Sequence, residues 1–163
     1  MKKKSLLVVM RMRDRLQNAL CDQTCDLARY LRDIESAELE SRETTSKGLI
    51  RCVHHWRARV IVPSILAPHV DGGFLEWTVQ IERQANEYVS RWFVEPRFMK
   101  GSVLCEATMS LAPAIGGRGT RVELELDVLR DNGSVGFQNI ANRILTTQFR
   151  KIVEASVRLV DEK

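Results

Sequence analysis

TRVELELDVL, residues 120–129, alternates apolar and charged side chains without interruption. Successive side chains of an extended strand point to opposite sides, so this alternation gives the segment two different faces. The apolar face carries Val122, Leu124, Leu126 and Val128. The other face carries Arg121, Glu123, Glu125 and Asp127. A strand with one buried face and one wet face is typical of an antiparallel sheet, and we predict such a strand over residues 120–130.

A long amphipathic helix is predicted to follow this strand, over residues 135–161. The turn residues Asp131, Asn132 and Gly133 separate the two elements. Apolar positions then recur at intervals of three and four residues, which places them on one side of a helix. This side carries Phe137, Ile140, Ala141, Ile144, Leu145, Gln148, Phe149, Ile152, Ala155 and Leu159. An antiparallel sheet can pack on that side of the helix.

Period-two patterns also mark the residues before this strand. Turn signals divide them into five further predicted strands, at residues 37–45, 49–61, 74–83, 87–95 and 98–111. A first strand is predicted over residues 4–13, and one of its faces carries Leu6, Val8, Met10 and Met12.

Two short helices are predicted between the first strand and the second. Asp14 can cap the first, at residues 14–21, and Asp22 or Thr24 can cap the second, at residues 25–34. The apolar residues of both helices are spaced for one inward face. The predicted order is therefore a strand, two short helices, six strands and a long helix.

The composition fits one soluble globular domain over residues 1–163. Apolar residues make up 44% of the chain and charged residues 28%. The net charge of +4 and the pI near 9.0 are only mildly basic, and charges of both signs are interspersed. We therefore expect no nucleic-acid partner, while contact with an anionic membrane surface and the oligomeric state are left open. No apolar run approaches the roughly 20 residues that span a bilayer, and no signal peptide is recognised, so we expect a cytoplasmic protein.

The cysteines do not form a metal-binding pattern. They are Cys21, Cys25, Cys52 and Cys105, and no CxxC or HxxxH pair accompanies them. We therefore predict no metal and no cofactor. A cytoplasmic chain of this size needs no disulfides, and we expect reduced, mostly buried thiols.

This order of elements resembles the helix-grip fold of the START-like (SRPBCC) superfamily, which includes the Bet v 1 allergens and the bacterial polyketide cyclase/dehydrase-like proteins. The resemblance covers nearly the whole chain and depends on the element order, the short helix pair and the amphipathic C-terminal helix. It implies an α+β fold in which a curved, seven-stranded antiparallel sheet wraps around the long C-terminal helix. It carries no catalytic motif, since this superfamily has no single one.

In START-like proteins the sheet and the long helix leave a deep, largely apolar cavity between them. Known members bind lipids, sterols, plant hormones or polyketides there, and a few catalyse cyclisation, dehydration or hydrolysis. By this resemblance, inward positions of the strands and of the helix would line such a cavity. The predicted ligand-binding residues are His54, Trp56, Trp77, Tyr88, Trp92, Cys105, Met109, Phe137, Ala141, Ile144, Leu145 and Gln148.

RCVHHWRARV, residues 51–60, contains the most informative of these positions. Alternation puts His54 on the apolar face with Cys52 and Trp56, and it turns His55 to the wet face. A buried histidine needs a partner: it could be a general base, it could anchor a ligand, or it could be satisfied within the core. A register error of one residue would exchange His54 and His55.

Three arginines of this stretch share the wet face with His55. They are Arg51, Arg57 and Arg59, and side chains of the next predicted strand can pair with them, namely Glu76, Gln80 and Glu82. These arginines therefore need no nucleic acid to explain them. The proline-containing connection that follows, residues 63–73, is the expected gate of the cavity.

The sequence leaves three functions open. The leading hypothesis is binding or transport of a hydrophobic or amphipathic small molecule, such as a lipid or a polyketide-like compound. A cyclase, dehydratase or hydrolase could use the same cavity, with His54 as its acid or base. An interaction protein could instead act through the outer surface, for which the candidate residues are Arg143, Arg150, Lys151 and Arg158.

Overall fold

Seven strands form one antiparallel sheet in the computed structural model, which describes residues 3–59, 76–96, 104–130 and 135–162. Within these ranges, side chains are described at all positions except 96, 104, 128–130 and 135–144. The strands are β1 (Lys3–Val9), β2 (Ile34–Thr44), β3 (Leu49–Ala58), β4 (Glu76–Gln84), β5 (Val89–Pro96), β6 (Leu104–Ala114) and β7 (Gly119–Arg130). Their spatial order is β1-β7-β6-β5-β4-β3-β2, so the first strand of the chain pairs with the last.

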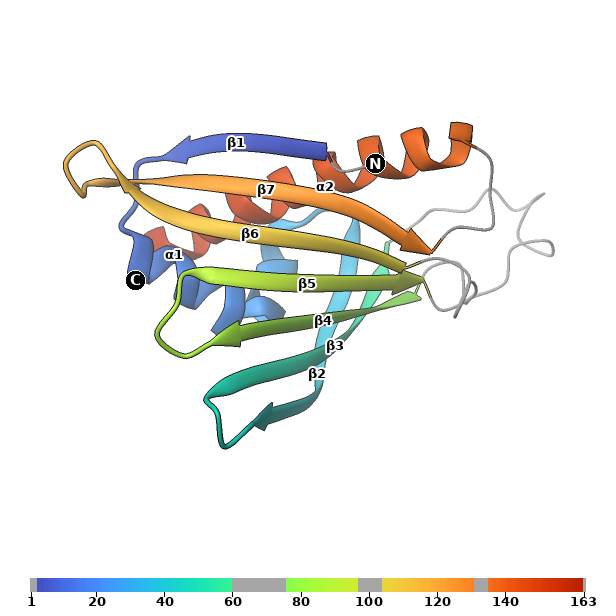
Figure 1. The fold of residues 1–163 in the computed structure, drawn as a ribbon, viewed down its shortest axis with the longest axis horizontal. Coiled ribbons are helices and arrows are strands. Elements are labelled where there is room, and N and C mark those ends of the chain that lie inside the picture. The colour runs from blue at the N-terminus through green and yellow to red at the C-terminus, as the bar shows by residue number, and fades with distance from the viewer. Residues whose placement is uncertain (1–2, 60–75, 97–103, 131–134, 163) are drawn as a thin grey trace.

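Helices cover one face of this sheet. A segment of three short helices joins β1 to β2: α1 (Arg13–Gln17), a π-helical turn η1 (Asn18–Asp22) and a 3₁₀-helix η2 (Thr24–Tyr30). The long C-terminal helix α2 spans Val135–Asp161, as predicted. Figure 1 shows α2 and the short helices behind the same face of the sheet, which curves around them. The predicted α+β helix-grip architecture is thus confirmed.

The two ends of the sheet differ in how their strands are connected (Figure 1). At the hairpin end, tight turns join β2 to β3, β4 to β5 and β6 to β7. At the opposite loop end, β3, β5 and β7 finish, and β4, β6 and α2 begin. The expected gate, residues 63–73, lies outside the described residues.

The helical segment differs from the prediction in both caps and in its end, since the N-cap of η2 is Gln23 rather than Asp22 or Thr24. Met12 rather than Asp14 is the N-cap of α1, and no side chain there makes a cap hydrogen bond. The second helix was expected to reach residue 34, but η2 ends at Tyr30. Ile34 instead begins β2, because it is buried at the edge of the sheet, where it pairs with Ala58 of β3.

The face of β1 that carries Leu6, Val8, Met10 and Met12 in the prediction is the solvent-exposed face. β1 itself ends at Val9, and more than half of each of those four side chains is exposed. The intervening residues Leu7 and Val9 pack against the core instead. Both faces of this strand are apolar, so alternation alone does not determine which face is turned inward.

Candidate functional site

The sheet register aligns four inward side chains in one row across neighbouring strands. His54 on β3 is paired with Val79 on β4, Val79 with Val94 on β5, and Val94 with Cys105 on β6. His54 is 3% exposed, and its neighbour in sequence, His55, points to the convex face. The register thus confirms that His54, rather than His55, is the inward histidine.

Trp56 lies two residue pairs closer to the loop end than this row. It is 2% exposed and is paired directly with the half-buried Trp77 of β4. His54 and Trp56 are separated by a single residue, so their side chains leave β3 on the same, concave face. The structure therefore brings four of the predicted binding residues into one region of the loop end: His54, Trp56, Trp77 and Cys105.

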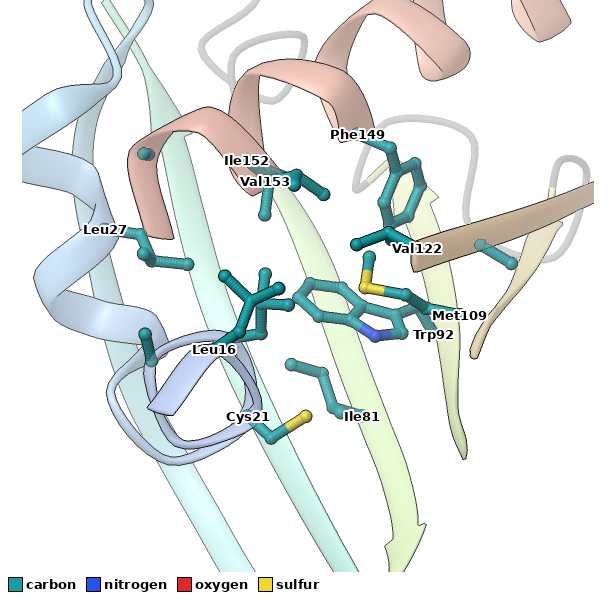
Figure 2. Close-up of a cluster of buried hydrophobic side chains, with 14 of the residues drawn as sticks. Leu16, Cys21, Leu27, Ile81, Trp92, Met109, Val122, Phe149, Ile152 and Val153 are labelled. Atoms are coloured by element: carbon teal, nitrogen blue, oxygen red, sulfur yellow. The ribbon is translucent and has the colours of Figure 1, made fainter. Parts of the chain in front are cut away.

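The interior toward the hairpin end is filled by packed side chains (Figure 2). Trp92 is fully buried and meets Phe149 of α2 edge to face, with ring centroids 5.5 Å apart and an interplanar angle of 78°. Side chains from the sheet and from the helices surround this pair, including Leu16, Cys21, Leu27, Ile81, Met109, Val122, Ile152 and Val153. Trp92 and Met109, both predicted to line a cavity, are therefore part of this packed core, and the buried cluster extends to Trp56 at the loop end.

Nearly every described polar side chain that is buried has a hydrogen-bond partner. Gln17 donates to the carbonyl of Glu87, and Thr24 donates to that of Leu20. Ser90 accepts from the indole of Trp92, and the remaining bonds run from Thr120 to the carbonyl of Arg11 and from Ser156 to that of Val153. Buried polar groups are normally satisfied in this way, because an unmade hydrogen bond is costly in a folded protein.

His54 and Trp56 are the exceptions on the concave face. Nδ1 of His54 and Nε1 of Trp56 are buried, and neither has a hydrogen-bond partner among the described residues. Burial lowers the pKa of His54, and a backbone hydrogen bond with Val79 offsets part of that shift. The imidazole is therefore neutral near pH 7, and it presents one ring nitrogen to the interior without a partner.

Two other predicted binding residues occupy different parts of the molecule. Tyr88 lies at the hairpin end, where its hydroxyl donates to the Asp14 carboxylate and the Arg13 guanidinium stacks over its ring at 3.5 Å. This bond also explains why Asp14 does not cap α1. Gln148 lies on a flank of α2 that faces a surface groove of about 290 Å³, between α2 and residues 30–33.

The remaining predicted binding residues come from α2. Leu145 is half-buried and packs against the core. The other three belong to the part of α2 whose side chains are not described: Phe137, Ala141 and Ile144. Lys151, a candidate of the outer-surface hypothesis, forms an ion pair of 2.9 Å with Asp33 beside the groove.

The convex face bears the predicted cross-strand charge pairs. Arg51 donates to Glu82 at 2.9 Å, and Nε of Arg57 lies 3.9 Å from Glu76. His55 lies among carboxylates on the same face, with Nε2 3.5 Å from Glu76 and Nδ1 4.0 Å from Glu40. These arginines are thus occupied by neighbouring acids, as the alternation predicted.

The described ranges contain neither a metal-binding cluster nor a membrane-spanning helix. No three His, Cys, Asp or Glu side chains there are arranged to hold a metal ion. None of the described helices is both long and apolar enough to cross a bilayer. All four cysteines carry thiols rather than disulfides, and three of them are buried while Cys25 is half-buried.

Solved structures with very different sequences share this architecture. Ara h 8.0201 aligns over 100% of this chain and 99% of its own, with a TM-score of 0.69 and 11% identity. The Zhui aromatase/cyclase from a Streptomyces strain aligns over 99% and 93%, with a TM-score of 0.67 and 10% identity. The chain has the START-like, Bet v 1-like helix-grip fold. Norcoclaurine synthase from Thalictrum flavum has the same helix-grip fold, with a TM-score of 0.64 and 14% identity over 100% and 87% of the two chains.

At these identities the likeness concerns the helix-grip fold alone. The sequence itself matches no protein-family model and no curated protein. The resemblance predicted from the element order is thus confirmed at the level of the fold. What this helix-grip protein binds has to be argued from its own side chains.

Proposed function

We propose that the interior at the loop end binds a hydrophobic or amphipathic small molecule, with His54 and Trp56 as its polar contacts. One observation supports this function above all: both side chains bury a polar nitrogen that has no partner among the described residues. Leaving a buried donor or acceptor unsatisfied costs about 1–3 kcal/mol for each group. A bound molecule with a polar group would supply the missing partner and remove that cost.

The surroundings of these two nitrogens suit an apolar molecule. The neighbouring inward positions are Val79, Val94, Cys105 and the ring of Trp77. A largely apolar wall with a few polar groups is the usual composition of a small-molecule site. The packed core around Trp92 would limit the ligand on the hairpin side. The names of two similar structures, an aromatase/cyclase and a synthase, are consistent with a fold that accommodates small organic molecules.

Catalysis in the same site is a second candidate function. A neutral imidazole nitrogen that carries no proton can accept one, and His54 has a ring nitrogen that is buried and without a described partner. His54 would then act as the general base of a cyclase, dehydratase or hydrolase. The two functions differ in what they predict for His54→Ala, which should abolish turnover but leave binding largely intact if His54 is a base.

Native mass spectrometry of freshly purified protein tests the binding function. We expect an extra mass of a few hundred daltons, which solvent extraction would release for identification. A ligand present at 100 times its dissociation constant should also raise the free energy of unfolding by about 2.7 kcal/mol. The absence of both a retained mass and any thermal shift from a panel of lipids and polyketide-like compounds would show that the proposal is wrong.

The same extraction separates binding from catalysis. A binding protein should release the same compound from the wild type and from His54→Ala. An enzyme should release a compound from His54→Ala that the wild-type protein converts on incubation to a product of different mass or, for a cyclisation without loss of water, of different chromatographic retention. His55→Ala is the matched control, because His55 lies on the convex face and its loss should change neither result.

A further inference from the structure

We propose that the ligand is an uncharged molecule with a hydroxyl group that hydrogen-bonds to both His54 and Trp56. This inference rests on the proposed function and adds the chemical class of the ligand. It follows from the charges, the hydrogen-bonding capacity and the spacing of the groups on the concave face.

Among the described residues, the concave face offers no charged partner for a charged ligand. None of the described buried residues is Asp, Glu, Lys or Arg. The charged side chains of β3 and β4 instead pair with one another on the convex face, as Arg51 does with Glu82. A buried charge without a counterion or hydrogen bonds is far more costly than a neutral polar group. A carboxylate or an ammonium group is therefore disfavoured in this interior.

The two unpartnered nitrogens have complementary requirements. The indole Nε1 of Trp56 can only donate a hydrogen bond. Nδ1 of His54 belongs to a neutral imidazole, so it accepts or donates according to which ring nitrogen holds the proton. The oxygen of a hydroxyl group can accept a hydrogen bond from Trp56. In the same pose the hydroxyl group can either donate a hydrogen bond to Nδ1 or accept one from it. A carbonyl oxygen satisfies both nitrogens only when Nδ1 holds the proton. A hydroxyl group satisfies both nitrogens in either tautomer of His54.

The spacing of the two residues allows one oxygen atom to reach both. Residues His54 and Trp56 are two positions apart on an extended strand, so their Cα atoms are about 6.7 Å apart. One oxygen atom that bonds both nitrogens at about 2.9 Å holds them no more than about 5.8 Å apart, a separation that two side chains on the same face of one strand can reach. Trp77 and the row from Val79 to Cys105 would contact the apolar body of the ligand.

Two sets of matched compounds test this class. One set has a flat aromatic body: naphthalene, 2-naphthol and 2-naphthoate. The other has a flexible chain: decane, decanol and decanoate. Binding at neutral pH is measured by displacement of the uncharged fluorescent probe N-phenyl-1-naphthylamine. We expect the hydroxyl compound of at least one set to bind about tenfold more tightly than both its hydrocarbon and its carboxylate, an effect of the size that one or two net hydrogen bonds produce.

Variants assign that preference to the two residues. Trp56→Phe keeps an aromatic ring but removes the donor, and His54→Leu removes the ring nitrogens at similar volume. Each should reduce the hydroxyl preference several-fold while the hydrocarbon still binds. His55→Leu, on the convex face, should keep the full preference. Thermal unfolding by circular dichroism checks that each variant is folded, and either variant alone suffices for the test.

The outcomes distinguish this inference from the function on which it rests. Equal binding of the hydrocarbon and the hydroxyl compound, or tighter binding of the carboxylate, overturns the inference and leaves a hydrophobic site in place. A full hydroxyl preference that persists in either folded variant also overturns it. If neither set of compounds binds, the inference is wrong, and the native mass spectrum then decides independently whether the proposed function is wrong as well.

Discussion

Trp92 donates its indole N–H to the hydroxyl of Ser90 at 2.9 Å, across two positions of the same strand. Both residues are buried, and the hydroxyl is the partner that Trp56 lacks on the neighbouring part of the sheet. Ser90→Ala would leave the Trp92 donor unsatisfied in the core. We expect the free energy of unfolding to fall by about 1–3 kcal/mol, as measured by chemical denaturation. Ser110→Ala, a half-buried serine on the convex face, is the control and should change it by less than about 0.5 kcal/mol.

The ligand-free protein should respond much less to His54→Leu than to Ser90→Ala. The substitution puts apolar volume in place of a buried nitrogen that has no described partner, and it also removes the backbone hydrogen bond between His54 and Val79. Removing the unsatisfied nitrogen is neutral or stabilising, whereas losing the hydrogen bond is destabilising. We therefore expect the free energy of unfolding to change by less than about 1 kcal/mol in denaturation of ligand-free protein. A loss as large as that of Ser90→Ala would mean that His54 is already satisfied in the unliganded interior.

An ion pair at the hairpin end should make the end of α2 sensitive to acid. Arg11 donates two hydrogen bonds to the Asp161 carboxylate, and the hydrogen bond from Arg11 holds the pKa of Asp161 below its ordinary value. The pKa of Asp161 is lower in the folded protein than in the unfolded chain. The pair therefore stabilises the folded state at pH values above the ordinary pKa of Asp, about 3.9. That contribution is lost as the pH falls through the folded pKa.

Hydrogen exchange of the last turn of α2 measures this effect. Protection there should decrease as the pH falls below about 4, once the intrinsic pH dependence of exchange is removed. In Arg11→Met the same amides should already be less protected at neutral pH, and the acid-dependent step should disappear. An unchanged acid-dependent step in Arg11→Met would contradict the role of this pair.

The thiols should differ sharply in reactivity. Burial raises the pKa of Cys21 to about 11, and Cys21 is only 5% exposed. Thiolate is the reactive form, so Cys21 should remain unlabelled by a thiol reagent at mildly alkaline pH until the protein unfolds. Cys25 is half-buried and should be labelled first. Peptide mapping after brief labelling gives the order, and early labelling of Cys21 would show that the core around α1 opens readily.

The sequence predicted best those features that depend on strong alternation. The pattern of residues 120–129 placed Val122, Leu124 and Leu126 on the buried face, where the structure has them. The same rule separated His54 from His55 correctly, because Cys52 and Trp56 flank His54 on one face and arginines dominate the other. Alternation works where the two faces differ strongly in polarity. Alternation does not decide which face is turned inward in β1, because Leu6 and Leu7 belong to opposite faces that are equally apolar.

The candidate site could be predicted only in part, because contacts between distant segments decide it. An inward tryptophan can fill a core or line a cavity, and only the position of Phe149 shows that Trp92 does the former. Tyr88 stands at the end of a turn, where the arrival of Asp14 from α1 determines its partner. Gln148 lies at the margin of the helical stripe, so a small rotation of α2 decides which surface it faces. No sequence signal identifies the unpartnered nitrogen of Trp56.

The pairing of β1 with β7 has a consequence for the order of events during synthesis. Lys3 pairs with Leu126, and Arg11 meets Asp161 at a separation of 150 positions. During synthesis β1 therefore has to wait for β7, which follows much later in the chain, before it can join the sheet. Contacts between residues so distant along the chain form slowly, since long loops must close first. During that interval both apolar faces of the first strand are uncovered, and the nascent chain is at its most vulnerable to aggregation.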